Sequence, residues 1–426
     1  MWGWSQADEA VRARVRWFAA RPDFFRLWAG ESVSQLGTAI TSIALPLVAI
    51  STLHATAIEV GAVAAAGQAP PLLFGLLIGS LVDRGRRRPV LIGANLGRAI
   101  LLGTIPVAAA LHMLTMYQLY VVAFVAGTLT VWFGVAYLAF VPSLVPREDL
   151  MRANSALELS RSAARIIGPN LGAGLVQTVS APVAVVGDAV SFLIAAVFSR
   201  SIGHAEQRPD RTVRARLWRE AAQGLAVVRR SEFLLPLAVS SAIANVAWGA
   251  QLAILILYMT RQLGLPAALL GPIFAAGNVG FLIGAAAAQP LAARHGPGRT
   301  LVVSQLVSIL GAALIPLAGG PVGIAAVLLA AAQFLTVGPL IVYTINATSL
   351  RQAVSAGPLA GRVNATMESI SWCTAPAGSV LGGWLGQTLG LRPTLVAVVA
   401  GLLLALPWTF RSSLRNLRVL PAAPDT

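Results

Sequence analysis

Few side chains in this sequence can carry chemistry, and most of those lie inside long apolar segments. Glu31 is the clearest case. Gln35, Thr38 and Ser42 follow it at intervals of 4, 3 and 4 residues, which places the four side chains on one face of a helix. An ionisable side chain inside an apolar membrane helix is costly to bury and marks a functional site by default. Glu31 is therefore the first candidate for coupling to protons or to a cationic substrate, and Asp188 is the second.

A second polar stripe, formed by Ser241, Asn245 and Trp248, repeats the first one 210 positions later. Two related polar faces on two apolar helices are expected to line a shared cavity rather than to face lipid. The alternative is a pair of helix faces that hydrogen-bond to neighbouring helices, and the sequence leaves that alternative open.

Other kinds of chemistry find little support. The chain has one cysteine, Cys373, and four scattered histidines, so no thiolate cluster or metal-ligand spacing is present. All 31 basic residues are Arg, and a Walker phosphate loop cannot be built without Lys. We therefore expect no enzyme activity, no metal and no cofactor.

Composition places these residues in a membrane. The chain of 426 residues is 57% hydrophobic and 11% charged, whereas a soluble domain carries roughly 25% charged residues. Apolar runs long enough to cross a bilayer as helices predict an all-α membrane protein with twelve transmembrane helices. They lie at 27–51, 58–82, 90–111, 117–142, 155–177, 182–200, 234–258, 267–292, 301–318, 322–346, 365–388 and 393–410.

The arginines predict the orientation. The two terminal stretches and every second connection hold 25 of the 31 Arg, while the alternating connections hold two, Arg261 and Arg392. The positive-inside rule places both termini and the central loop in the cytoplasm, as in a multi-pass protein of the bacterial cell (inner) membrane. Because the basic residues flank helices on the side of anionic lipid, they predict lipid contact and no nucleic-acid partner.

The sequence also contains an internal duplication. At an offset of 210 residues, the run Arg152-x-Asn154-x-x-x-Glu158 repeats as Arg362-x-Asn364-x-x-x-Glu368 without a gap. We divide the chain into an N-terminal six-helix half (1–200), a cytoplasmic linker (201–233), a C-terminal six-helix half (234–412) and a tail (413–426). Parallel repeats of this kind bind substrate near the midplane, and access alternates as one half rocks against the other.

The run Gly79-Ser-Leu81-Val-Asp83-Arg84-Gly85-Arg86-Arg87-Arg88-Pro89 resembles the signature loop of the major facilitator superfamily, Gly-x-Leu-Ala-Asp-Arg-x-Gly-Arg-Arg/Lys. Arg86 stands where the pattern has Gly. In that family the acidic residue caps a neighbouring helix and pairs with Arg, which agrees with the preference of helix N-termini for carboxylates. The resemblance therefore implies a cytoplasmic gate of Asp83, Arg84, Arg87 and Arg88, with Gly79 as a helix-packing residue.

In the fifth segment, Gly168-Pro169-x-x-Gly172 resembles the Gly-Pro-x-x-Gly-Gly motif of exporting members, and these three residues are expected to pack helices closely. Two further runs resemble the enterobactin-exporter branch: Phe25-Arg26-Leu27-Trp28-Ala-Gly30-Glu31-x-x-Ser34-Gln35-Leu36-Gly37 at the start of the first segment, and Asp188-Ala-Val-Ser191-Phe192 in the sixth. The resemblance implies a proton-coupled efflux antiporter for a small amphipathic metabolite, drug or siderophore.

The family resemblance implies that segments one, four, seven and ten line the cavity. Candidate substrate-binding residues are accordingly Gln35, Thr38, Trp132, Tyr137, Asn245, Trp248, Gln333 and Tyr343. Near the cytoplasmic end of the fifth segment, Glu158, Arg161 and Arg165 are spaced for an ion-pair ladder beside the gate, and Glu368 is the image of Glu158. Arg98 is expected to neutralise a nearby carboxylate in the second or third segment.

Other functions remain open at this point. A nutrient importer of the same fold would have a similar sequence. A membrane sensor would carry a sizeable soluble domain, and a lipid-processing enzyme would need a cluster of nucleophile, base or metal ligands; the sequence offers neither. The expected partners are a small-molecule substrate, protons and membrane lipid, and the expected state is a monomer.

Overall fold

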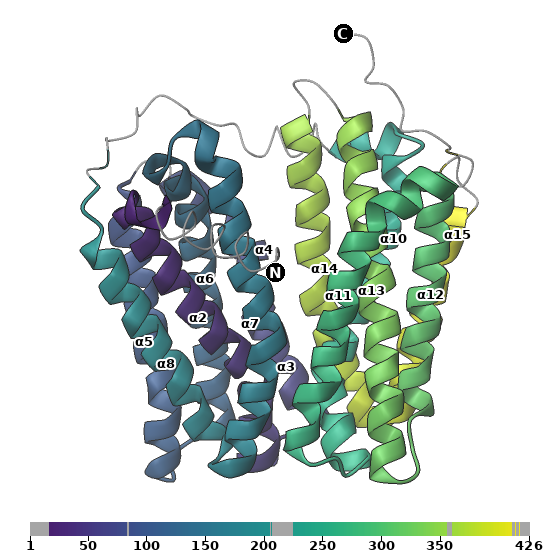
Figure 1. The fold of residues 1–426 in the computed structure, drawn as a ribbon. Helices are drawn as coiled ribbons and strands as arrows, with labels where there is room; N and C mark the ends of the chain where they lie inside the picture. Colours follow the sequence, from purple (N-terminus) through teal and green to yellow (C-terminus); the bar gives the residue numbers. More distant parts are fainter. Residues whose placement is uncertain are drawn as a thin grey trace, which may run out of the picture.

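The computed structural model describes residues 17–82, 85–204, 206, 225–355, 360–410, 414 and 417, and this part of the chain contains helices and no strand. Asp83 and Arg84 of the predicted gate therefore lie outside the described residues. Two bundles of helices stand side by side, one from each half of the chain (Figure 1).

The N-terminal bundle starts with α2 (Pro22–Leu47), whose last turn widens into the π-helix η1 (Val48–Thr52). α3 (Ala57–Gln68) and α4 (Pro70–Val82) follow each other across a break at Ala69, because neither Pro70 nor Pro71 can donate a helix hydrogen bond. The remaining elements are α5 (Arg87–Ala110), α6 (Met116–Leu144), the short η2 (Arg147–Asp149), α7 (Leu150–Thr178) and α8 (Ala181–Ser201).

The C-terminal bundle contains α10 (Leu234–Leu257), the π-helix η3 (Tyr258–Gln262), α11 (Ala267–His295), α12 (Pro297–Leu317), α13 (Val322–Val354), α14 (Ala360–Thr388) and α15 (Leu391–Phe410). Each of the twelve predicted ranges falls on helix. Ten of them are long and apolar enough to cross a membrane. The other two, 155–177 and 365–388, fall on α7 and α14, which have 29 residues each but more polar sequences.

The duplication predicted at an offset of 210 is visible in the backbone. The π-helices Val48–Thr52 and Tyr258–Gln262 are separated by that offset. His54 and its image Gly264 both have positive φ, 53° and 64°, so both halves make the same turn after the π-helix. Because π-helices are rare, their recurrence at the same offset supports a common origin of the two halves.

Close helix crossings hold each half together. A Cβ on Gly168 would lie 2.3 Å from Ala39 Cβ, and one on Gly172 would lie 2.9 Å from the Ile40 carbonyl oxygen, so α7 packs directly on α2. The images of these glycines make the same contact in the second half. A Cβ on Gly378 or Gly382 of α14 would meet the backbone of α10 at 2.1 or 2.5 Å. Gly168 and Gly172, which the sequence marked as packing residues, thus lie at a close helix crossing whose partner helix the sequence did not identify.

Two other predicted packing residues behave differently. Pro169 is buried in α7, and its carbonyl oxygen lies 3.0 Å from the place a Cβ would take on Gly271 of α11, so it packs between the halves. A Cβ on Gly79 would meet nothing within 4 Å. Gly79 therefore makes no close helix contact here, which corrects the prediction from the signature loop.

The two halves meet at one end of the molecule and separate at the other. α7 packs on α11, and α3 packs on α14, which makes the two related contacts between the halves. One large core joins them near the connections 53–56 and 263–266; it includes Leu47, Ile50, Leu257 and Leu270. We call this the sealed end.

At the opposite end, the cores of the two halves are separate: one contains Phe24, Leu91 and Phe140, and the other contains Leu234 and Leu350. The described residues 85–86, 202–204 and 225–233 lie here, and most of the described arginines outside the spans do as well. We call this the basic end; it is uppermost in Figure 1.

The α2–α7 crossing generates a prediction. Gly172→Ala should lower the stability of the protein by about 1–3 kcal/mol, because the added methyl meets the backbone of α2, which cannot move aside alone. Thermal unfolding in detergent measures the change. Gly174→Ala is the matched control on the same helix, since a Cβ there meets nothing within 4 Å. Equal melting temperatures for the two variants would contradict the crossing.

Candidate functional site

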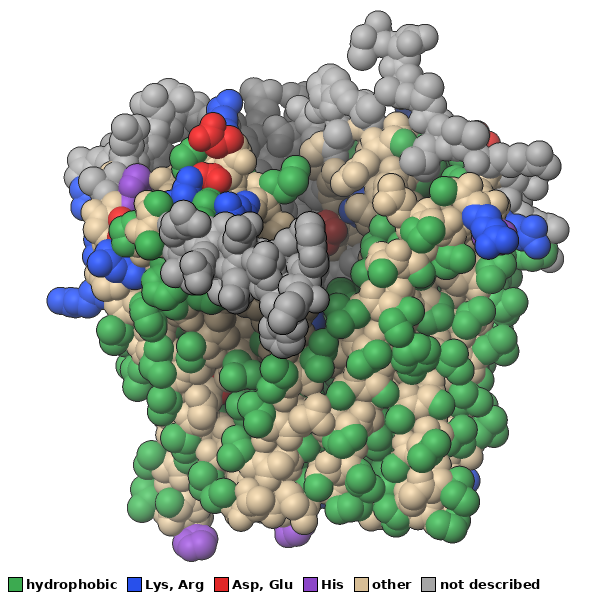
Figure 2. Space-filling view, viewed as in Figure 1, with side chains coloured by type: hydrophobic (Ala, Val, Ile, Leu, Met, Phe, Trp, Pro, Cys, Tyr) green, Lys and Arg blue, Asp and Glu red, His purple; other side chains and the backbone are tan. Residues whose placement is uncertain are grey.

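The surface is hollowed between the two halves at the basic end (Figure 2). Hydrophobic side chains cover most of the outer surface below, and charged side chains gather at the upper end in the same view. This distribution is the one expected for a protein whose outer surface faces hydrocarbon next to a charged rim. The polar stripes and buried charges can be placed relative to this hollow.

Three buried charges lie within the N-terminal half: Glu31 on α2, Arg98 on α5 and Asp188 on α8, which are 7%, 6% and 1% exposed. The positive charge of Arg98 acts on both carboxylates. Among the described residues, Arg98 forms no ion pair within 4 Å, so the attraction acts across a longer distance. The sequence predicted a carboxylate in the second or third segment as the partner of Arg98. The two carboxylates on which Arg98 acts lie instead in the first and sixth segments, on α2 and α8.

Aromatic rings and a helix carbonyl fix the Arg98 guanidinium. It lies 4.6 Å from the ring centre of Phe133 and 4.1 Å from that of Phe192. Its Nη2 donates to Asn95 Oδ1 at 2.6 Å, and its Nε donates to the Ala94 carbonyl at 3.3 Å. Cation–π contacts strengthen when the cation is desolvated, so the guanidinium is stabilised here without direct contact to an acid.

Glu31 begins the polar stripe that the sequence predicted. Gln35 Nε2 donates to Glu31 Oε1 at 2.6 Å, which ties the first two members together. Thr38 and Ser42, farther along the same face, are exposed. Because α8 and α7 occupy other faces of α2, through Gly37 and Ile40, this stripe is turned away from both packed neighbours.

Asp188 is held against α2 by a glycine. A Cβ on Gly37 would lie 2.6 Å from Asp188 Oδ1 and 2.2 Å from Ser191 Oγ. Ser191 Oγ also lies 3.1 Å from Asp188 Oδ1 as a hydrogen-bond donor. Gly37 therefore lets α8 bring this carboxylate onto the surface of α2, and its role in coupling stays a prediction.

The second stripe lies on α10. Asn245 Nδ2 donates to the Ser241 carbonyl at 2.8 Å, and the side chains of both residues are half-buried. Trp248 is 49% exposed, which is unusual for so large a side chain. Asn245 and Trp248 remain predicted substrate-binding residues, as do Gln35 and Thr38.

The other predicted cavity residues pack inside helix contacts. Tyr137 stacks on Phe133, with ring centres 5.6 Å apart, and Trp132 is half-buried beside the same core. Tyr343 donates to Ser240 Oγ at 3.3 Å, and Gln333 is buried next to Gly277. In this conformation Tyr137, Tyr343 and Gln333 are not open to a ligand, and their role in substrate binding stays a prediction.

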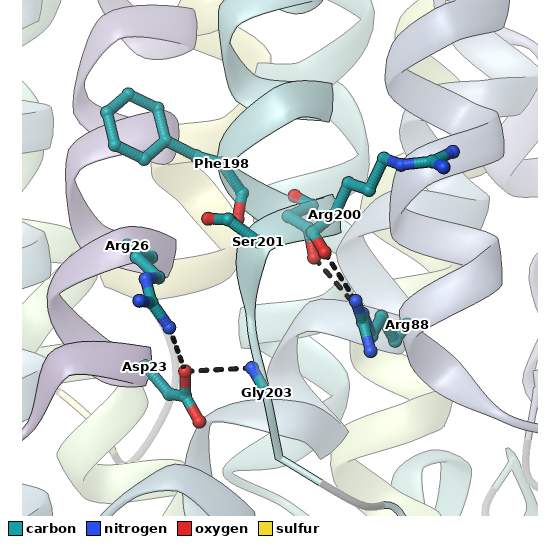
Figure 3. Close-up of polar contacts among 8 residues, drawn as sticks. Asp23, Arg26, Arg88, Phe198, Arg200, Ser201 and Gly203 are labelled. Atoms are coloured by element: carbon teal, nitrogen blue, oxygen red, sulfur yellow. Dashed lines mark hydrogen bonds and ion pairs between the residues drawn. The ribbon is translucent and has the colours of Figure 1, made fainter.

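The basic loop at the end of the signature run ties α5 to its neighbours. Arg88 donates from Nε to the Ser199 carbonyl at 3.3 Å and from Nη2 to the Arg200 carbonyl, at the C-terminal end of α8 (Figure 3). Arg87 Nη1 donates to the Ala139 carbonyl of α6 at 2.9 Å. Both arginines therefore bind backbone within their own half.

A carboxylate does cap the helix here, and it comes from the central linker. The backbone N–H groups of Arg87 and Arg88 donate to Glu206 at 2.9 and 3.1 Å, at the positive end of α5. Asp23 of α2 accepts from the Gly203 N–H at 2.9 Å and from Arg26 at 2.8 Å (Figure 3). Sequence reasoning missed Glu206 and Asp23, because their partners are 119 and 180 residues away.

The predicted ion-pair ladder on α7 forms only in part. Glu158 pairs with Arg161 at 3.4 Å, while Arg165 instead lies 5.4 Å from the ring centre of Phe281 on α11. Arg165 therefore bridges the two halves through an aromatic ring. Glu368 pairs with Arg351 of α13 at 3.6 Å, so the two images use different partners.

The sealed end has polar contacts that the sequence did not reveal. Arg261 Nη2 donates to the Ile50 carbonyl at 3.2 Å, from the C-terminal half to the N-terminal half. Arg392 Nη2 donates to the Ala318 carbonyl at 2.6 Å. The two arginines that depart from the charge pattern thus satisfy carbonyls at helix ends, and a lone Arg in an apolar connection was the available signal.

Two similar helical halves around a hollow that is open at one end and sealed at the other define the class of alternating-access membrane transporters. The chain belongs to the Major Facilitator Superfamily, because the sequence model of that family matches residues 27–376. The family consists of transporters and not enzymes, as the sequence predicted.

The chain is similar to two named efflux proteins. Macrolide efflux protein A of Streptococcus pyogenes is 27% identical over 216 residues, which are 50% of this chain and 53% of that protein. The match therefore spans about half the length of that relative. The multidrug efflux pump Tap of Mycolicibacterium fortuitum is 26% identical over 401 residues, 89% of this chain and 93% of the pump.

Solved structures share the fold at low identity. The nucleoside transporter NupG has a TM-score of 0.75 at 12% identity, over 91% of this chain and 98% of NupG. A bacterial homologue of the lysosomal transporter Spinster, in an inward-facing and unoccupied conformation, has a TM-score of 0.72 at 14% identity, over 94% of this chain and 100% of that one.

The polar stripe generates a prediction. In a Cys373→Ser background, Thr38→Cys should react with a membrane-impermeant maleimide added from the basic end, since a thiolate forms only where water reaches it. Mass spectrometry measures the labelled fraction. Ile100→Cys is the control: that side chain is also exposed, at 67%, but on the apolar surface of α5. Equal labelling at both positions would contradict a water-filled hollow beside α2.

Proposed function

We propose that this transporter exports a small amphipathic molecule, of the drug, metabolite or siderophore kind, in exchange for protons. The observation that carries the proposal is the buried cluster of Glu31, Arg98 and Asp188. The similarity to two proteins named as efflux pumps supports export as the direction.

The cluster suits proton coupling because its charges do not balance. Two carboxylates and one guanidinium carry a net negative charge when all three are ionised, and burial of an uncompensated charge is expensive. A proton on either carboxylate makes the cluster neutral. Arg98 attracts both acids, so its positive charge can stabilise the negative charge of either one.

A route connects this cluster to a bound substrate. Glu31 accepts a hydrogen bond from Gln35, which belongs to the stripe that we assign to substrate binding. Protonation of Glu31 would weaken that bond and change the position of the Gln35 amide, and exchange requires that this change disfavour substrate binding. With Thr38, Asn245 and the exposed face of Trp248, the hollow offers hydrogen-bonding groups and one large apolar plane, which suit an amphipathic molecule.

Orientation follows from the arginines. We assign the basic end to the cytoplasm and the protein to the bacterial inner membrane, with both termini cytoplasmic. The hollow then faces the cytoplasm, from which an exporter takes its substrate. We assign residues 1–200 and 234–412 to the two moving halves, 201–233 to the linker between them and 413–426 to the tail, and we expect a monomer.

The gate of the proposed cycle lies at the basic end. Arg87, Arg88 and Glu206 brace α5, α6 and α8 against one another, so the N-terminal half can move as a unit. The helices α7 and α14 each contact the opposite half, and they carry Glu158, Arg161 and Glu368. These charged groups are placed to form new contacts when the basic end closes.

Glu31 generates the first test. Glu31→Gln should abolish substrate export driven by a pH gradient in inside-out vesicles, down to the level of vesicles without the transporter, because an amide cannot carry the proton. Binding of the substrate to purified protein should remain. Glu148→Gln, an exposed acid at the basic end, is the control and should export normally. A Glu31→Gln variant with unchanged rate and pH dependence would overturn the coupling role.

The direction of transport has its own test, because the similarity of the fold to a nucleoside transporter leaves import as the second candidate. Intact cells that express the protein should accumulate less of a labelled macrolide than cells that express the Glu31→Gln variant. Collapse of the proton gradient should remove the difference. Higher accumulation in cells with the unchanged protein would favour an importer.

A further inference from the structure

A groove runs along the outer face of the C-terminal half, between α11 and α12 and over α13. It encloses about 420 Å³ and lies away from the Glu31 cluster, which belongs to the other half. Its walls are mainly apolar and include Ile283, Ala287, Val303, Val307 and Leu335. Ile283 and Val303 are about half exposed, so the groove opens onto the outer surface.

The groove exists because α11 and α13 pack very closely, while α12 contacts α13 and leaves a space beside α11. A Cβ on Gly284 of α11 would lie 2.2 Å from the Gly338 carbonyl oxygen, so α11 and α13 are in backbone contact. α12 packs extensively on α13 and touches α11 only slightly. The space between α11 and α12 is therefore left open over the α11–α13 contact.

The N-terminal half has no equivalent combination of residues. Phe74 stands at the position related to Gly284 by the 210-residue offset. Phe74 packs edge-on against Phe124, with ring centres 6.0 Å apart. The small residue that forms the floor of the groove is therefore not repeated in the N-terminal half.

One end of the groove is cationic. His295 and Arg299 line it at the basic end, and Arg294 is exposed beside them. α12 begins at Pro297, so the positive end of its dipole lies at the same place. Figure 2 shows basic side chains at the upper edge of the C-terminal half, above a mostly hydrophobic outer surface.

The hydroxyl groups in the walls are already used. Thr300 Oγ1 donates to the Gly296 carbonyl at 2.8 Å, and Ser304 Oγ donates to the Thr300 carbonyl at 2.6 Å. Away from its mouth the groove therefore offers apolar contact to an occupant and few hydrogen bonds. The groove therefore suits an occupant that has an anion at one end and a hydrocarbon chain along the rest of its length.

We propose that this groove binds an anionic phospholipid from the leaflet at the basic end. The headgroup phosphate lies between His295 and Arg299, and one acyl chain lies along Ala287 and Val307. The match of charge and apolar surface selects this occupant, and the outward opening gives lipid direct access. The bound lipid fills the gap between α11 and α12, so it stabilises the C-terminal half whether or not the transporter carries substrate.

Native mass spectrometry of the whole protein, released from micelles that contain equal phosphatidylglycerol and phosphatidylcholine, tests the proposal. The unchanged protein should retain phosphatidylglycerol preferentially. Arg299→Gln should weaken that retention about fivefold, which corresponds to the ~1 kcal/mol that one basic residue contributes near an anionic surface. Arg147→Gln removes an exposed Arg at the basic end of the other half and should change nothing.

Ala287→Phe gives a second arm, because Ala287 lines the groove and a larger side chain there would occupy its volume. It should reduce retention of both lipids while the protein still folds. Equal retention of both lipids by the unchanged protein, or equal effects of Arg299→Gln and Arg147→Gln, would overturn the proposal. Displacement of the lipid by a macrolide would also overturn it and mark the groove as a drug site.

Discussion

Backbone-to-backbone packing between helices is the contact on which the rest of this structure depends. Lipid is as apolar as the side chains it touches, so membrane helices associate through close fit rather than through the hydrophobic effect. Gly168 and Gly172 seat α7 on α2, and Gly378 and Gly382 seat α14 on α10. These crossings make each half stiff. Motion is therefore expected between the halves, where α7 meets α11 and α3 meets α14.

The duplicated fold carries chemistry that is not duplicated. The positions related to Glu31, Arg98 and Asp188 hold Ser241, Ser308 and Val398, so the second half has no charged counterpart of the cluster. It has a neutral network instead: Gln305 donates to Ser240 Oγ at 3.0 Å and accepts from Thr409 at 2.7 Å. A neutral network fixes helices without a group that can gain or lose a proton. The two halves are thus alike in shape and divided in task.

The sequence predicted the helices well and the side-chain partners less well, for physical reasons. Apolar length and the placement of Arg are local properties, and each predicted range falls on helix. The ends are predicted less well: α13 continues to Val354, beyond the predicted 346, and the range 58–82 is broken at Ala69. Partners across the chain are not local: nothing near Arg87 indicates that Glu206 caps its helix, and nothing near Arg98 indicates two flanking rings. A family resemblance names the helices that line a cavity, but it does not say which side chains of those helices are open to it. Tyr137 and Tyr343, which we expected in the cavity on that ground, are buried.

The charge count of the Glu31, Arg98 and Asp188 cluster has an electrical consequence. A half whose buried cluster is neutral can reorient without moving charge through the membrane field. A half that carries one uncompensated negative charge moves that charge through the field. The electrical energy of a full crossing is about 2.3 kcal/mol per 100 mV. In a proton exchanger the substrate leaves with the deprotonated cluster and the return stroke carries the proton. For an uncharged substrate, the membrane potential would therefore drive the substrate-loaded stroke more than the return stroke.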